Sequence, residues 1–260
     1  MKDIIPKDFR VMVREGRWRL PTAGVAMGHA QMNLVILPER YAFDFLLFCQ
    51  RNPKPCPVIE VLEKGRYLTS FSAKEGDIRT DIPGYNIYID GSLQETQQDI
   101  INVWASDFVT FLIGCSFSFE DALIRAGIPI RHIEEKKNVP MFITNIGCSP
   151  GGIFRGDMVV TMRPIHKEKI FKTIQITSRY ASVHGGPIHI GDPTLIGIKD
   201  LNTPDFGDPV AVWENEIPVF WACGVTPQLA VINARPGICI THKPGHMFVS
   251  DLLNEELATF

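Results

Sequence analysis

Residues 38–62 read PERYAFDFLLFCQRNPKPCPVIEVL, and this stretch contains both patterns that decide the fold. The residues after Pro38 have helical spacing with a proline near the start, and the pattern ends before Asn52 and Pro53. The apolar run 57–62 that follows is typical of a short strand. Helical patterns alternate with short apolar runs along the chain, which predicts a mixed α/β or α+β fold. Further strands are expected at 85–89, 139–143, 158–162 and 218–222.

One longer segment, 96–115, reads TQQDIINVWASDFVTFLIGC and also has helical spacing. Apolar residues that recur at this spacing form one face of a helix. We therefore expect a long helix here. The apolar positions are Ile100, Ile101, Val103, Trp104, Phe108, Phe111 and Leu112.

The composition is that of an ordinary globular protein. The 260 residues are 45% hydrophobic and 21% charged, with a net charge of -3, which excludes intrinsic disorder. A slightly acidic chain lacks the basic surface that neutralises phosphates, so no nucleic-acid partner is expected. No window approaches the ~18 consecutive apolar residues of a membrane span, and the amino terminus has no apolar signal region.

The six cysteines are scattered without a C-x-x-C pair, which favours reduced thiols. We therefore expect a cytoplasmic protein. A homodimer is the default expectation for its oligomeric state.

Common cofactor motifs are absent from the sequence. It contains no G-x-x-x-x-G-K-[ST], no G-x-G-x-x-G and no H-E-x-x-H pattern, so no nucleotide cofactor is expected. Residues 147–151 match G-x-S-x-G, but Pro150 follows the serine and has no N–H to donate to an oxyanion. Because this donor is missing, the match does not support a serine hydrolase.

The wider segment 144–152, TNIGCSPGG, combines small residues with polar side chains. Glycine-rich loops let backbone N–H groups approach an anion closely. We predict a ligand loop, with Cys148 as a candidate nucleophile; the alternative is a tight connection between two lobes. The predicted substrate-binding residues of this loop are Thr144, Asn145, Ser149 and Gly151.

The segment 184–193, HGGPIHIGDP, is the richest in chemistry. Its glycines and proline form a turn that can bring His184 and His189 together. The two histidines then supply a general base and a general acid, with Asp192 orienting one of them. Two alternatives stay open: His184, His189 and Asp192 bind a divalent metal, or they are turn and capping groups. No cofactor is predicted unless the metal alternative holds.

Four further residues are candidates for binding a small carboxylate. Arg163 and Arg79 are suited to clamp it, since arginine binds carboxylates with two parallel hydrogen bonds; the alternative is a structural ion pair. Gln31 and Asn33 are either substrate contacts or turn residues.

A third histidine cluster spans residues 241–246, THKPGH. Its proline and glycine exclude a helix that would align the two histidines for zinc. We interpret this segment as a loop that contributes to a cleft.

Glycines and polar residues increase in number from about residue 145 to 215. We therefore predict that 145–215 forms a smaller inserted lobe that carries much of the site. Residues 1–144 and 216–260 then form a discontinuous main lobe.

The chain as a whole resembles the D-glutamate cyclase family, a group of bacterial proteins labelled hydro-lyases. The resemblance runs in order through nearly the whole chain. Its blocks are 22–38 (TAGVAMGHAQMNLVILP), 45–57 (FLLFCQRNPKPCP), 77–85 (DIRTDIPGY), 111–123 (FLIGCSFSFEDAL), 127–133 (GIPIRHI), 144–165 (TNIGCSPGGIFRGDMVVTMRPI), 183–193 (VHGGPIHIGDP), 204–208 (PDFGD), 218–228 (PVFWACGVTPQ) and 241–252 (THKPGHMFVSDL).

This resemblance implies an α/β architecture of two lobes, a three-layer α/β/α lobe and a smaller two-layer α+β lobe. It also implies that the chain is a hydro-lyase for a small carboxylate. An animal relative, which has an additional carboxyl-terminal domain, forms 5-oxo-D-proline from D-glutamate. The alternatives are a metal-dependent lyase or hydrolase and a non-catalytic protein that binds a small carboxylate.

Overall fold

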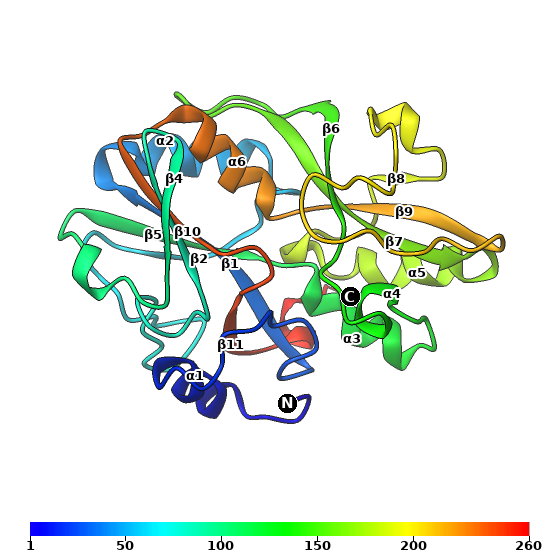
Figure 1. The fold of residues 1–260 in the computed structure, drawn as a ribbon, viewed down its shortest axis with the longest axis horizontal. Coiled ribbons are helices and arrows are strands. Elements are labelled where there is room, and N and C mark those ends of the chain that lie inside the picture. Colours follow the sequence, from blue (N-terminus) through cyan, green and yellow to red (C-terminus); the bar gives the residue numbers. More distant parts are fainter. Residues whose placement is uncertain (260) are drawn as a thin grey trace.

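The computed structural model describes residues 1–259, which form two antiparallel β-sheets with helices on their faces (Figure 1). A seven-stranded sheet has the order β2-β5-β1-β10-β3-β4, with β11 also paired to β1, and a four-stranded sheet has the order β6-β7-β9-β8. The predicted mixture of helices and sheets is confirmed; the finer layering stays a prediction. The strands are β1 (His29–Pro38), β2 (Val58–Leu62), β3 (Tyr85–Ile89), β4 (Ser92–Gln97), β5 (Phe108–Gly114), β6 (Met141–Gly147), β7 (Asp157–His166), β8 (His189–Ile190), β9 (Glu216–Ala222), β10 (Ile238–His242) and β11 (Phe248–Leu253).

Helices join these strands or cover the sheets. No helix of the described residues is long and apolar enough to cross a membrane. The α-helices are α1 (Pro6–Arg14), α2 (Glu39–Arg51), α3 (Phe117–Arg125), α4 (Arg131–Glu134), α5 (Ile170–Ser178) and α6 (Val225–Ala234). Short 3-10 helices are η1 (Ile101–Val103), η2 (Lys167–Lys169), η3 (Ala181–Val183), η4 (Pro193–Ile196) and η5 (Asn254–Leu257).

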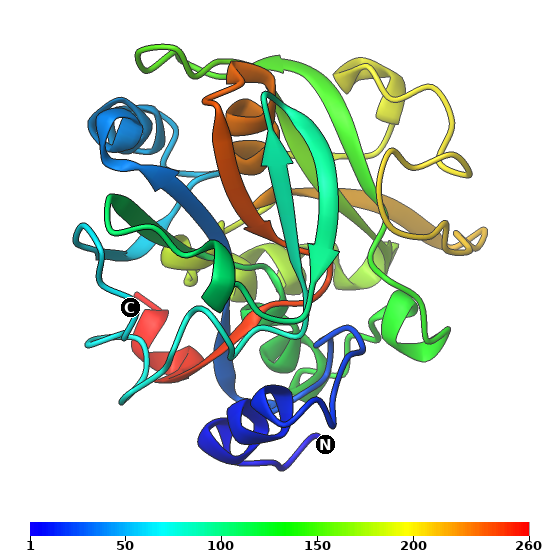
Figure 2. The ribbon, with the colours of Figure 1, turned by 60° about the vertical axis from the view of Figure 1, so that its left-hand side comes forward.

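Strand β1 organises the larger sheet. One edge pairs with β5 from Met32 to Pro38. The other edge is shared, because β11 pairs with its first half and β10 pairs with Val35 and Ile36. In Figure 2 the orange-red β10 lies in the upper part of the view and the red β11 in the lower part. The edge of β1 therefore forks at Asn33, between the last partner in β11 and the first in β10.

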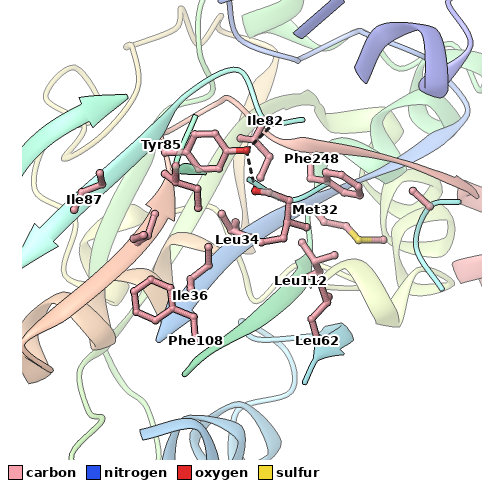
Figure 3. Packing of buried hydrophobic residues seen from close by; sticks show 14 residues of the cluster. Met32, Leu34, Ile36, Leu62, Ile82, Tyr85, Ile87, Phe108, Leu112 and Phe248 are labelled. Atoms are coloured by element: carbon pink, nitrogen blue, oxygen red, sulfur yellow. Dashed lines mark hydrogen bonds between the residues drawn. The ribbon is translucent and has the colours of Figure 1, made fainter. Parts of the chain in front are cut away.

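The core covers both faces of β1. Met32 and Leu34 pack on one face with the rings of Tyr85 and Phe248 (Figure 3). On the other face, Val35 packs in a cluster with side chains of α2 and α6. Burial of both faces explains why β1 is a continuous apolar run instead of an alternating one.

The β6–β7 hairpin ties the smaller sheet to helix α2. The carboxamide of Asn52 accepts from the N–H of Ser149 and donates to its carbonyl, at 2.8 and 2.7 Å. A Cβ on Gly151 would lie 2.4 Å from the backbone nitrogen of Phe48, so only glycine fits this approach. The four-stranded sheet uses residues from 141 to 222; the lobe boundaries at 145 and 215 stay predictions.

The helix predicted over 96–115 is wrong. Strand β4 ends at Gln97, η1 forms one short turn, and β5 occupies 108–114. Every residue of β5 is buried, since it lies between β1 and β2. A strand buried on both faces has no alternation of polar and apolar residues, so its apolar run has the same pattern as a buried helix.

We expect Tyr85→Phe to lower the free energy of unfolding by about 1–3 kcal/mol, because it leaves two buried backbone groups without partners. The Tyr85 hydroxyl donates to the carbonyl of Ile78 at 2.8 Å and accepts from the N–H of Ile82 at 3.2 Å (Figure 3). Urea denaturation measures the change. The control Tyr41→Phe, at a half-buried tyrosine, should stay within about 0.5 kcal/mol; equal effects at both positions would contradict the assignment.

Candidate functional site between the two sheets

His184 lines an open pocket of about 910 Å³ beside α5. It follows η3 in the left-handed region, with a φ of 83°. Its Nδ1 lies 2.9 Å from the carbonyl oxygen of Lys54, and its Nε2 is buried without a partner. Burial lowers the pKa of His184 to about 4, so the ring is neutral near pH 7.

His189 and Asp192 are not brought together with His184 around this pocket. His189 Nε2 lies 2.7 Å from the backbone oxygen of Asp192. The Asp192 carboxylate instead caps η4, accepting from the hydroxyl and the N–H of Thr194, and these bonds hold its pKa below the ordinary value. Within residues 1–259 no three His, Cys, Asp or Glu side chains are arranged to hold a metal ion.

The predicted ligand loop makes structural contacts. Ser149 and Gly151 lie against α2, as described above. Thr144 donates to the carbonyl of Met158 at 2.7 Å, and Asn145 packs beside Gly197. Burial raises the pKa of the Cys148 thiol to about 11, so it is not a thiolate near neutral pH. These contacts correspond to the alternative of a tight connection.

The other predicted carboxylate ligands have protein partners. Arg79 forms a two-point ion pair with Asp77 and stacks 3.3 Å over the ring of Tyr67. Gln31 and Asn33 both lie in strand β1, so they are not turn residues. Gln31 donates to the carbonyls of Thr22 and Val25.

Asn33 lines a small, partly open pocket between the two sheets, which we call the inter-sheet cavity. Its lining is mostly apolar, with a few polar side chains, and ligand sites often have this composition. Its walls come from both sheets. They consist of Asn33, Cys115, Ser116, Phe117, Asn138, Val139, Met141, Thr161, Cys223, Gly224, Val225, His242, Gly245 and Met247.

Two strand–cysteine–helix units meet at this cavity. Strand β5 leads through Cys115 and Ser116 into α3, and β9 leads through Cys223 and Gly224 into α6. The first turns of both helices face the cavity, because Phe117 and Val225 line it. Helix N-termini present backbone N–H groups and favour negative charge. The N–H of Val225 already contacts Cys223 Sγ at 3.5 Å and that of Thr226 bonds to the carbonyl of Cys223 at 3.0 Å, so any preference for an anionic group comes from the helix dipoles.

Equivalent hydroxyls fix the two helices. Ser118 Oγ accepts from the N–H of Gln31 in β1 at 3.1 Å, and Thr226 Oγ1 accepts from the N–H of Val159 in β7 at 2.9 Å. Each helix start is thus held to a strand of the sheet beside it. The recurrence of GCSFS (114–118) and ACGVT (222–226) is the sequence signal for this arrangement.

His242, at the end of β10, supplies the one imidazole that lines the cavity among the described residues. Its Nδ1 lies 2.9 Å from the carbonyl oxygen of Lys243, so this nitrogen carries the proton of the neutral ring. Its Nε2 lies 2.9 Å from both the Gln228 amide nitrogen and Asn33 Oδ1. Nε2 is therefore an acceptor in the neutral ring, and Asn33 Oδ1 is in reach of a proton added there.

Burial lowers the pKa of His242 to about 4, so the ring is neutral near pH 7. Burial also raises the pKa of the Cys223 thiol to about 11 and that of Cys115 above its ordinary value. The two thiols in the cavity wall are consequently protonated. The group able to accept a proton at this site is the imidazole.

Arg163 lies directly behind the cavity wall. Its guanidinium donates to the Glu120 carboxylate, to Thr161 Oγ1 at 2.9 Å and to Ser116 Oγ at 3.0 Å. His132 Nε2 is 3.2 Å from the same Glu120 oxygen, although the contact is not aligned as a hydrogen bond. Burial alone would raise the pKa of Glu120, but His132 and Arg163 hold it below the ordinary value.

Among the residues that line this cavity, residue-type reasoning named Asn33 and the region of His242 and did not name Ser116 or Thr161. These four residues come from β1, the start of α3, β7 and β10. Their separation along the chain hides the site from any local motif.

The comparisons with known proteins agree with an enzyme site. The family model described as D-glutamate cyclase matches residues 109–251, which include Ser116, Thr161 and His242. A Geobacillus kaustophilus protein described as “Putative hydro-lyase” is 57% identical, covering 96% of this chain and 95% of the relative. One from Bacillus subtilis with the same description is 56% identical, covering 97% and 98%.

The similarity to hydro-lyases over nearly the whole chain defines an enzyme of the hydro-lyase class. The chain belongs to the D-glutamate cyclase family, and the predicted family is confirmed. A solved structure of a nitrogen repressor-like protein from Methanococcus jannaschii covers 93% of each chain with a TM-score of 0.41 and 12% identity. At that TM-score it adds nothing to the assignment.

We expect the free energy of unfolding to fall as the pH is lowered from about 6.5 towards about 4. The folded protein keeps His184 and His242 neutral through this window, because the pKa of each is about 4. The unfolded chain binds these protons near pH 6.5, so each histidine contributes up to about 1.4 kcal/mol per pH unit. Urea denaturation between about pH 7 and 5 measures the slope.

His242→Gln should reduce this slope by about one bound proton. The matched variant His166→Gln, at a side chain that is 41% exposed, should leave it near the wild-type value. A wild-type slope in His242→Gln would show that His242 is not held neutral in the folded protein.

Proposed function

We propose that the inter-sheet cavity is the active site of a hydro-lyase for a small amino or hydroxy acid. Its proposed reaction is the cyclisation of D-glutamate to 5-oxo-D-proline with loss of water. The observation that supports this best is the neutral imidazole of His242, which lies with Ser116, Thr161 and two helix N-termini around one cavity. The family description supports the choice of substrate.

The proton balance of this reaction needs one shuttle group. The ammonium nitrogen of glutamate loses two protons as it becomes the lactam N–H, and the departing carboxylate oxygen gains two as it becomes water. His242 Nε2 takes a proton from nitrogen and returns it to oxygen, and the step occurs twice. Asn33 Oδ1, 2.9 Å from Nε2, stabilises the protonated ring between the transfers.

The carboxylate under attack is a poor electrophile and needs donors where negative charge increases. The Ser116 and Thr161 hydroxyls, together with N–H groups at the starts of α3 and α6, are suited to this role. Contacts to both ends of the substrate would also favour its folded conformer, in which the amine lies near the side-chain carboxylate.

The sequence-based hypothesis gave the acid and base roles to His184 and His189. His184 lines a different and more open pocket, and His189 lines neither of the two cavities. The cytoplasmic location and the homodimer are further expectations that accompany the proposal. Variants at the two pockets separate the hypotheses.

We expect His242→Gln to lower turnover by roughly 10²- to 10⁴-fold, the usual contribution of a general base. An NMR time course with D-glutamate, L-glutamate and 5-oxo-D-proline, with and without divalent metal, measures conversion. His184→Gln and His189→Gln are the competing arms, and His166→Gln is the control for loss of an imidazole. Circular dichroism confirms that each variant is folded.

Loss of turnover in His184→Gln, with wild-type rates in His242→Gln, would transfer the site to the open pocket, and the same result for His189→Gln would place it beside His189. No conversion of any of the three compounds by the wild-type protein would contradict glutamate cyclisation itself.

A further inference from the structure

Arg163 is only 1% exposed, and protein groups accept hydrogen bonds from nearly all of its N–H donors. Nε and one Nη donate to the Glu120 carboxylate, and the Nη atoms also donate to Ser116 and Thr161. The rings of Phe119 and Trp221 lie 5.3 and 5.4 Å from the guanidinium carbon. The guanidinium plane is therefore fixed on several sides.

These contacts determine what the two hydroxyls can offer to a ligand. A hydroxyl has one hydrogen to donate and two lone pairs to accept with. Arg163 occupies a lone pair on Ser116 Oγ and on Thr161 Oγ1, so each hydrogen is left to point elsewhere. Within residues 1–259 neither hydroxyl donates to another protein group, and both line the inter-sheet cavity.

We infer that Arg163 is a positioning residue that holds Ser116 and Thr161 as paired hydrogen-bond donors for a carboxylate in the inter-sheet cavity. This inference rests on the proposed function and adds which residues select a carboxylate as the ligand. Glu120 neutralises the guanidinium, and Arg163 does not itself line the cavity. The ligand carboxylate is thus recognised by two neutral hydroxyls, and Arg163 acts through them.

A double-mutant cycle tests this role. The variants are Arg163→Lys, Thr161→Val and their combination, and the probe is glutarate, a dicarboxylate without the reacting amine, titrated by calorimetry. Each single variant should weaken binding by roughly 10- to 100-fold, the effect of losing hydrogen bonds to a charged group. The combined variant should bind about as weakly as Arg163→Lys alone, because Arg163→Lys already leaves the Thr161 hydroxyl unoriented.

Effects that multiply in the combined variant, or wild-type binding in Arg163→Lys, would overturn the inference. Thr161→Ser is the conservative rescue and should recover most of the binding lost in Thr161→Val. Arg79→Lys controls for the loss of a guanidinium elsewhere. A wild-type protein that binds neither glutarate nor 5-oxo-D-proline would overturn the proposed function instead.

If Arg163→Lys does not fold, Ser116→Ala and Thr161→Val carry the test. The inference requires that each weakens glutarate binding while the pH dependence of binding is kept, since His242 is unchanged. Wild-type affinity in both variants would overturn it.

Discussion

Strand β1 is buried on both faces and hydrogen-bonded along both edges, and one edge is shared by two strands. On the shared edge, the pairing with β11 ends at Met32 and the pairing with β10 begins at Val35, so the ladder is interrupted at Asn33. The Asn33 amide nitrogen donates to the carbonyl of Gly114 at 2.7 Å, and its Oδ1 lies 2.9 Å from His242 Nε2. The inter-sheet cavity lies at this fork. A strand that must pair with three others therefore creates both the core of the large sheet and the opening for the site.

The polar groups around the cavity contribute little to the stability of the fold. Desolvation of a buried ion pair such as Arg163–Glu120 offsets much of its Coulomb attraction. A buried neutral histidine lowers stability once the pH falls below about 6.5, because the unfolded chain then binds a proton that the folded chain does not. Stability comes from the apolar clusters on the two faces of β1. The cavity wall thus combines a rigid apolar frame with polar groups whose value lies in their geometry.

The sequence predicted the helix of residues 39–51, most of the strands and the family, since these depend on local patterns or on the whole chain. It failed at Phe108–Gly114, where burial on both faces removes the alternation that identifies a strand. The site was harder, because Asn33, Ser116, Thr161 and His242 meet only through the sheet topology. The dense histidines of 184–189 attracted the prediction, although His184 lines a different pocket and His189 lines neither.

The charge state of the cavity bears on how a base with so low a pKa can act. None of the described residues that line the cavity is Asp, Glu, Lys or Arg, so the site is neutral before a ligand enters. In the proposed reaction, a bound carboxylate would place negative charge beside His242 and raise the pKa of its imidazole. The base would then become stronger only when the substrate is present. Because both protons of the proposed reaction leave with the product water, His242 would return to the neutral state, and the cavity would regain its original charge after each turnover.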